Sequence, residues 1–324
     1  GTTLLSSPSA LNYGDGSLGT GTVGGIAYTL GSGIPALNTT NKTSYFTGRS
    51  DGFGPGPSSN PSDARFDPES VRVSRDGRSV FISDEYGPYI YQFDRATGQR
   101  IRSFTLPNNL AVEHLGTTTA SEGKPFNTTG RVANKGMEGL AITPDGRTLV
   151  GIMQAPLLQD RNGYLRLVTI DIASGITHEY AYKLTTGTGV SDIVAINDHE
   201  FLVDERDGKG MGDGTRAVVK QLFRIDIAHA TDVSGIPVLQ DSTFSGNLPT
   251  AVAVAKSASP VVDLVAILSA AGIASEEILG QRIDDPPLRG VGVLCLVDED
   301  VIEAAVQLVA DPVGQLAAAE QGCG

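Results

Sequence analysis

A unit that occurs three times constrains the fold of this chain most strongly. Each copy has an acidic residue, a short apolar run, a tight turn and a second apolar run, and the copies cover residues 69–85, 138–152 and 192–205. Asp-Gly pairs at 76–77 and 145–146 form the first two turns, because glycine adopts the positive φ that tight hairpin turns require. The acids that open the copies are 69 and then 54 residues apart. This repetition predicts three similar β-hairpins.

Further apolar stretches extend each hairpin to a larger sheet. Third strands are predicted at residues 89–94, 165–171 and 222–226, and fourth strands at 101–106 and 177–184. Residues 24–28 and 45–51 resemble a degenerate earlier copy. Units of four antiparallel strands are typical of propeller blades, which bury their faces only by packing around a common axis. We therefore predict an all-β fold, a β-propeller of four-stranded antiparallel blades.

The chain changes character after about residue 250, which divides it into a propeller at 1–250 and an atypical segment at 251–324. Residues 262–271 and 301–310 have helical periodicity or propensity. Residues 282–324 hold two basic and eight acidic residues and no Asp-Gly hairpin, so we expect no four-stranded blade there. This predicts an incomplete ring with a helical or irregular tail. Cys295 and Cys323 are then incidental thiols rather than a designed bridge.

Charge and motif content exclude several classes of function. With 24 Lys and Arg against 37 Asp and Glu, the net charge of −13 argues against nucleic-acid binding. No apolar stretch is long enough for membrane insertion, no histidine pair has zinc-ligand spacing, and no Gly-x-Ser-x-Gly motif is present. Glycine patterns within residues 14–24 lack a preceding apolar strand, so they predict a loop rather than a dinucleotide site.

Three sequons favour a secreted glycoprotein. They begin at Asn38, Asn41 and Asn127, in polar, turn-rich stretches where an acceptor has to be exposed. The absence of cysteine before residue 295 excludes a disulfide framework and a thiolate metal site in that part of the chain. We expect a secreted or extracellular monomer.

Acidic residues at repeated positions are the candidate functional groups, because equivalent positions of propeller blades converge on the central channel. Glu69, Glu138 and Asp192 open the three copies, and Asp51 is the matching acid of the degenerate copy. A ring of carboxylates suits Ca²⁺ or Mg²⁺, which take hard oxygen ligands. The structural alternative, which we keep open, is that such acids accept hydrogen bonds from local backbone amides.

A second set of acids ends the second strand of the first and third copies. It comprises Asp84, Glu85, Asp204 and Glu205, with Gln154 near the matching place of the second copy. Together with Glu138, these acids are predicted to bind metal or activate water. Lys135 and Arg206, adjacent to them in sequence, are predicted to contact the oxygens of a substrate phosphate.

Three motifs resemble the phytase-like domain family, labelled "esterase-like activity of phytase". They are Ser83-Asp84-Glu85-Tyr86-Gly87-Pro88, Asn134-Lys135-Gly136-Met137-Glu138-Gly139-Leu140-Ala141 and Asp204-Glu205-Arg206-Asp207. The resemblance covers about residues 24–232 and implies a secreted or periplasmic propeller of about six blades. Residues 262–281 resemble the helical insertion of that family. Residues 282–287 depart from the family pattern. A truncated or frame-altered gene would explain this departure, and so would true divergence of the sequence.

The acids and the resemblance together favour metal-assisted hydrolysis of phosphate esters, with calcium as the expected ion and a small phosphate ester as substrate. A non-catalytic propeller that binds a ligand or partner at its channel is the first alternative. A lactonase-like propeller hydrolase is the second, and it would need Asn or His beside the acids in its ligand set. Asn134 is the one obvious asparagine near a motif acid, so this alternative ranks lower.

Overall fold

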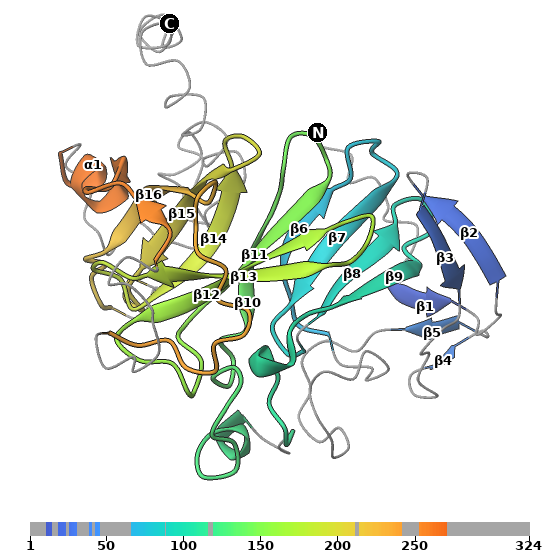
Figure 1. Cartoon of the computed structure of the whole chain (residues 1–324), viewed down its shortest axis with the longest axis horizontal. Coiled ribbons are helices and arrows are strands. Elements are labelled where there is room, and N and C mark those ends of the chain that lie inside the picture. The colour runs from blue at the N-terminus through green and yellow to red at the C-terminus, as the bar shows by residue number, and fades with distance from the viewer. Residues whose placement is uncertain are drawn as a thin grey trace, which may run out of the picture.

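The computed structural model describes residues 11–14, 19–23, 26–30, 39–40, 43–45, 66–87, 89–115, 119–210, 214–241 and 253–270. Its centre consists of three antiparallel sheets that follow one another along the chain (Figure 1). The first sheet contains β6 (Pro68–Val73), β7 (Ser79–Asp84), β8 (Tyr89–Asp94) and β9 (Arg100–Thr105). The second contains β10 (Met137–Ile142), β11 (Thr148–Met153), β12 (Tyr164–Asp171) and β13 (Thr177–Lys183). The predicted hairpins and their third and fourth strands are confirmed here.

The third sheet is completed by residues that return from further along the chain. Its first strands are β14 (Gly189–Ala195), β15 (Glu200–Arg206) and β16 (Lys220–Asp226). Two short strands, β17 (Ala255–Lys256) and β18 (Val262–Asp263), both pair with β16. Between them and β16, residues 227–241 cross back to the second sheet, where the Val233 amide donates to the Glu179 carbonyl oxygen.

The innermost strands of the three sheets lie side by side. β10 contacts β6 on one side and β14 on the other, so the first strand of each sheet faces the first strand of the next. This is the arrangement of propeller blades, and it confirms the predicted all-β propeller class for the part of the chain that the structure describes. We call these sheets blades 1, 2 and 3.

The tight turns form where glycine permits them. Gly77 and Gly146 adopt φ of +70° and +73°, and the preceding aspartates accept hydrogen bonds from the backbone amides of Arg78 and Arg147. Asp76 and Asp145 are therefore turn residues, which stabilise the outer ends of their hairpins.

Two apolar clusters hold neighbouring blades together. Phe81, Phe104, Leu140 and Val168 belong to the cluster shared by blades 1 and 2. Ile152, Leu167, Ile193 and Phe201 belong to the cluster shared by blades 2 and 3. All eight side chains are buried. Since no blade can cover both faces alone, burial at these interfaces fixes the arrangement of the blades.

The N-terminal strands form two small sheets. They are β1 (Asn12–Gly14), β2 (Gly19–Val23), β3 (Ile26–Leu30), β4 (Thr39–Thr40) and β5 (Thr43–Tyr45). β2 pairs with β3, whereas β1 and β4 flank β5. The prediction of a loop was wrong for residues 19–23, because their backbone pairs fully with 26–30 despite its glycines.

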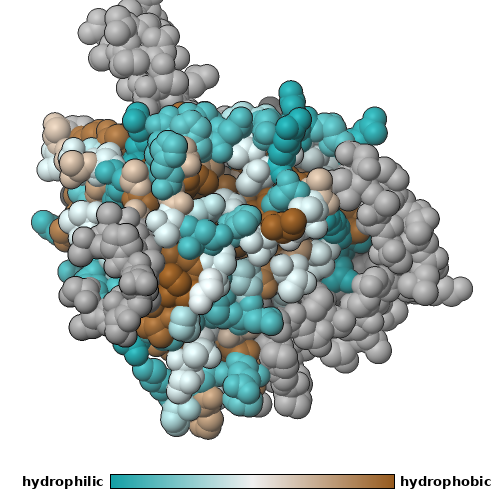
Figure 2. Space-filling view, viewed as in Figure 1, coloured by the Kyte–Doolittle hydropathy of each residue, from teal (hydrophilic) through white to brown (hydrophobic). Residues whose placement is uncertain are grey.

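Helices are short in the described part of the chain. They are the 3₁₀ helices η1 (Asn108–Leu110) and η2 (Thr119–Glu122) and the α-helix α1 (Leu264–Ala270), which confirms helix within 262–271. None of these helices is long and apolar enough to cross a bilayer. In the face shown in Figure 2, hydrophilic residues dominate the upper edge and apolar residues are exposed in patches below it.

The predictions for residues 282–324, including Cys295 and Cys323, lie outside the described residues, as do those for Asn38 and Asn41. Asn127 is among the described residues, and its environment differs from the exposed one predicted for a glycosylation site. Its side chain is buried and donates hydrogen bonds to the carbonyl oxygens of His114 and Glu122. Asn127 therefore lacks the exposure that a glycan acceptor needs.

Candidate metal and catalytic site

The innermost strand of every blade carries its acid at a break in the pairing. The register between first and second strands shifts between Pro68 and Val71, between Met137 and Gly139, and between Val190 and Ile193. The predicted acids Glu69, Glu138 and Asp192 lie at these breaks. A bulge re-aims a side chain and leaves its residue unpaired. All three acids thus lie at the same break of adjacent strands, although Glu69 is the first unpaired residue of its break and Asp192 the second.

Glu138, on the middle blade, is held by side chains of two blades. Gln154 Nε2 of blade 2 donates to Glu138 Oε2 at 2.8 Å, and Arg206 Nη2 of blade 3 donates to Oε1 at 3.1 Å. Burial raises the pKa of Glu138, while Arg206 and Gln154 oppose that shift. Its carboxyl group is therefore oriented and partly desolvated, which suits a group that exchanges protons.

The register corrects the predicted equivalence of the second acid set. Pro68 pairs with Asp84 and Val190 pairs with Glu205, so Asp84 corresponds to Glu205 and not to Asp204. Met137 pairs with Met153 at the same place of blade 2. The next residues in the three blades are Glu85, Gln154 and Arg206. One repeated position therefore supplies an acid, an amide and a cation, each from a different blade.

Three carboxylates meet beside this position in blade 1. Asp67, Glu69 and Glu85 each offer a carboxylate oxygen, and these oxygens all lie within 4.8 Å of one another. We call them the acid triad. Burial, followed by the charge of Glu138, raises the pKa of Glu69 and that of Glu85 to about 8. A divalent ion would relieve this repulsion, and three carboxylate oxygens are the hard donors that Ca²⁺ and Mg²⁺ prefer.

Asp192, predicted as a metal ligand, is neutralised from blade 1. Arg72 Nη2 donates to Asp192 Oδ2 at 2.8 Å, and Ser70 Oγ donates to Oδ1 at 3.3 Å. The Arg72 guanidinium also donates to the Ile193 carbonyl oxygen. Asp192 therefore joins blade 1 to blade 3 across the innermost strands, which is a structural role for its carboxylate.

Asp84 and Glu205 both accept hydrogen bonds from backbone amides. Asp84 accepts from the amides of Asp67, Tyr86 and Gly87. Glu205 accepts from the amides at residues 185–187, from the Tyr182 hydroxyl and from Lys256 Nζ. Although burial raises the pKa of Glu205, hydrogen bonds from Lys256 and Tyr182 bring it below its usual value. These contacts correspond to the structural alternative for the predicted acids.

Asp204 has a different environment. It is buried, and neither of its carboxylate oxygens has a hydrogen-bond partner in the structure. Burial raises its pKa to about 7, opposed by the charges of Lys220 and Arg206. A buried carboxyl group without partners is costly when ionised, so its surroundings shift Asp204 toward its neutral form.

Two predicted residues remain, Lys135 and Asp51. Lys135 is exposed on the segment that leads into β10, and Asp51 is outside the described residues. Sequence reasoning missed Asp67, Gln154 as a partner of Glu138, and Arg72. The alternation of a strand indicates Asp67, since it lies two residues before Glu69. A charged residue in an apolar strand was the signal for Arg72.

Comparisons with known proteins identify a matching family model and several distantly similar proteins. The family model described as "Phytase-like: Esterase-like activity of phytase" matches residues 29–267. A protein of Arthroderma benhamiae named "Uncharacterized secreted protein" is 32% identical over 157 residues, which cover 42% of this chain and 30% of that protein. The match thus spans less than a third of the relative's length.

Two solved structures are also similar. The Cps50 (Swd1) β-propeller domain of "Myceliophteria thermophila" gives a TM-score of 0.30 at 15% identity, over 51% of this chain and 38% of that one. Hydrazine synthase of Kuenenia stuttgartiensis gives a TM-score of 0.25 at 17% identity, over 49% of this chain and 51% of that one. Because both scores are low, the assignment of the fold rests on the chain's own sheets.

Proposed function

Because the chain belongs to the phytase-like family, we propose that it hydrolyses phosphate esters with a divalent metal ion, calcium in the first place, held by the acid triad. The observation that carries this proposal is the convergence of the Asp67, Glu69 and Glu85 carboxylate oxygens within 4.8 Å. The metal would supply Lewis-acid polarisation of a phosphoryl oxygen and lower the pKa of a bound water.

Glu138 is proposed as the general base. Its carboxylate is fixed by Gln154 and Arg206 on the side of blades 2 and 3. On the side of blade 1, its charge contributes to the raised pKa of Glu69 and of Glu85. A base so placed can remove a proton from a water beside the acid triad, and its raised pKa makes it a better proton acceptor.

Positive charge for the substrate comes from Arg206 and Lys135. The Arg206 side chain is about a quarter exposed, at 23%, beside Glu138. A guanidinium can bind two oxygens of a phosphate group at once, whereas the exposed Lys135 acts as a mobile point charge. Anionic phosphate is otherwise repelled by the acids, so the proposal requires both the metal and these cations.

Secretion is proposed from the family and from the relative named as a secreted protein. A calcium-dependent site fits that location, because extracellular calcium modules bind at about 10⁻⁴–10⁻³ M. Detection of the full-length gene product in the culture medium tests the proposed secretion.

The central experiment measures phosphate release from phytate and from p-nitrophenyl phosphate. Protein treated with EDTA is compared with protein resupplied with calcium, for the wild type, Glu69→Gln/Glu85→Gln and Glu138→Gln. The matched control is Glu113→Gln, an exposed acid outside the site. We expect calcium-dependent release that both site variants lower at least 100-fold, in line with loss of a catalytic acid–base group.

Two results contradict the proposal. Phosphate release that EDTA leaves unchanged excludes the role of the metal. Folded wild-type protein that binds calcium through the acid triad but turns over neither ester favours the alternative of a non-catalytic binding propeller.

A further inference from the structure

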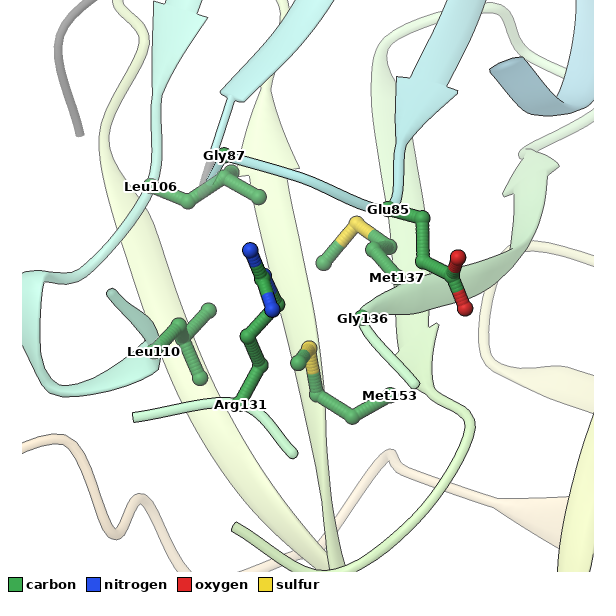
Figure 3. Close-up of a pocket in the computed structure, with 8 residues that line it drawn as sticks. All are labelled: Glu85, Gly87, Leu106, Leu110, Arg131, Gly136, Met137 and Met153. Carbon is green, nitrogen blue, oxygen red and sulfur yellow. The ribbon is translucent and has the colours of Figure 1, made fainter. Parts of the chain in front are cut away.

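Blades 2 and 3 fix their parts of the candidate site in different ways. In blade 2, Glu138 directly follows Met137, and Gln154 directly follows Met153. The two methionines pair with each other and are buried in the apolar cluster between blades 1 and 2 (Figure 3). In blade 3, Arg206 is the last residue of its strand, and its side chain is partly exposed. A long side chain at a strand end has many rotamers, so further contacts are needed to fix its guanidinium.

Ser191 supplies one such contact. Its hydroxyl oxygen accepts a hydrogen bond from Arg206 Nε, while Arg206 Nη2 donates to Glu138 Oε1 at 3.1 Å. These two nitrogens form one edge of the planar guanidinium, so the two contacts together set both its position and its plane. The bond to Glu138 alone would leave the guanidinium free to turn about that contact.

The backbone that carries Ser191 is itself held against blade 2. Ser191 is one of the two unpaired residues at the break between Val190 and Ile193. The Val190 amide donates to the Gln154 carbonyl oxygen at 3.0 Å. A Cβ added at Gly189 would lie 2.7 Å from the same oxygen, so the start of β14 is in close contact with blade 2. The Ser191 hydroxyl is therefore an acceptor with a fixed position relative to Glu138 and its partners.

This arrangement leaves the other end of the Arg206 guanidinium available. A guanidinium has five N–H donors, one on Nε and two on each terminal nitrogen. Ser191 takes the Nε donor, and Glu138 takes one of the Nη2 donors. Within the described residues, Nη1 has no hydrogen-bond partner. Nη1 and the second donor of Nη2 can therefore bind two oxygens of one phosphate group, which is a geometry that guanidinium groups favour.

We propose that Ser191 is a positioning residue, which holds Arg206 so that its terminal N–H groups bind the phosphate group of the substrate. The inference rests on the proposed function for the role of Arg206. It adds that affinity for phosphate depends on a hydroxyl group that acts through Arg206. The two extra residues of blade 3 then serve different purposes, because Ser191 orients Arg206 whereas Asp192 joins blade 3 to blade 1.

Phenylphosphonate separates binding from turnover, because a P–C bond replaces the ester bond that would be hydrolysed. Titration calorimetry measures its affinity for the calcium-loaded full chain, beside KM and kcat for p-nitrophenyl phosphate. Ser191→Ala should weaken phenylphosphonate binding and raise KM, each about tenfold, as expected for loss of a hydrogen bond to a charged group. The value of kcat should fall less than about threefold, because Gln154 still holds Glu138.

Further variants separate positioning from a general effect on the fold. Ser191→Thr keeps the hydroxyl and should restore binding to within about twofold of the wild type. Thr188→Val is the matched control, because the Thr188 hydroxyl lies 3.5 Å from the Arg206 backbone carbonyl oxygen and does not contact the guanidinium. It should leave binding unchanged. In an Arg206→Lys background, Ser191→Ala should cause little further loss, because lysine has no planar group to orient.

Several results would overturn the inference. They are undiminished phenylphosphonate binding by folded Ser191→Ala, an equal loss in Thr188→Val, and a full further loss in the Arg206→Lys background. Calcium-loaded wild type that does not bind phenylphosphonate overturns it as well. A different result separates the two proposals: if the wild type binds phenylphosphonate but hydrolyses no ester, and Ser191→Ala binds it more weakly, the proposed hydrolysis fails and the role of Ser191 stands.

Discussion

Two clusters of acids in neighbouring parts of the molecule differ in how their negative charges are compensated. In blade 2, Arg166 is fully buried and forms two bonds to Asp160, at 2.9 and 3.0 Å, and one to Glu179, at 3.0 Å. In blade 1, the acid triad brings Asp67, Glu69 and Glu85 together. The triad has no guanidinium at its centre in the described structure, although Arg131 lowers the pKa of Glu85 to some extent.

This difference separates an acid cluster that stabilises the fold from one suited to a ligand. Around Arg166, each acid has a charge partner, and Asp160 also accepts the backbone amide of Leu239, which fastens the segment that crosses back from blade 3. Around the triad, burial and like charges raise the pKa of Glu69 and Glu85. Uncompensated groups of this kind are concentrated at functional sites.

Among tests of this comparison, the substitution Arg166→Met has the largest expected effect. Removing one member of a buried ion pair leaves charges uncompensated, so we expect a loss of about 3–5 kcal/mol in the free energy of unfolding. Urea denaturation measures it. Arg161→Met, at an exposed position of the preceding turn, is the control and should change little. A loss as small as that of the control would show that the Arg166 cluster does not stabilise the fold.

The opposite result is expected for the acid triad. Glu69→Gln/Glu85→Gln removes repulsion, so in EDTA the free energy of unfolding should stay the same or increase. Calcium affinity, measured by titration calorimetry, should fall at least tenfold, about 1.4 kcal/mol. Marked destabilisation in EDTA would mean that the triad, like the Arg166 cluster, holds the fold together.

The stability of the protein should depend on pH through the acid triad. Glu69 and Glu85 have pKa values raised from 4.5 to about 8, so the folded protein holds their protons more tightly than the unfolded chain does. Stability in EDTA should therefore decrease as the pH rises from about 4.5 to about 8. Added calcium should raise the melting temperature more at pH 8 than at pH 5. An equal calcium effect at both pH values would contradict the role of these two carboxyl groups.

The smallest effect is expected at the outer turns. Asp145→Asn weakens hydrogen bonds from the Thr143 hydroxyl and the Arg147 amide, at 2.6 and 2.9 Å. The loss should be about 1 kcal/mol or less, because the group is close to solvent and an asparagine oxygen can replace the acceptor. Thermal unfolding measures it, and phosphate release should be unchanged. A change in activity would extend the site to the outer turns.

The sequence predicted the blades because Asp-Gly turns and apolar strands are local signals. It also predicted Glu69, Glu138 and Asp192 as candidate site residues, since each opens a repeated unit. It could not predict that Arg72 of blade 1 would neutralise Asp192, because these residues are 120 positions apart and meet only once the blades pack.

The equivalence of Asp84 with Glu205 was missed for a different reason. In blade 1 the break in pairing places two residues opposite Ser83, and in blade 3 it places two residues opposite Asp204. In blade 2 the extra residue is Glu138, and no residue lies opposite it. Counting along the sequence cannot detect such an offset, and the acid pairs Asp84-Glu85 and Asp204-Glu205 look alike when aligned by letter.

The breaks in pairing also bear on how this family can diversify. Glu138 is an extra residue in its strand, so a change of side chain there leaves the hydrogen-bonded ladder of β10 and β11 in place. The same holds for Glu69, which lies outside the paired positions of its strand. Asp192 differs, because its carboxylate holds Arg72 of blade 1. Selection can therefore exchange the chemistry of the channel at Glu69 and Glu138 while the scaffold keeps folding by the same rules, so that new activities can evolve without the fold being rebuilt.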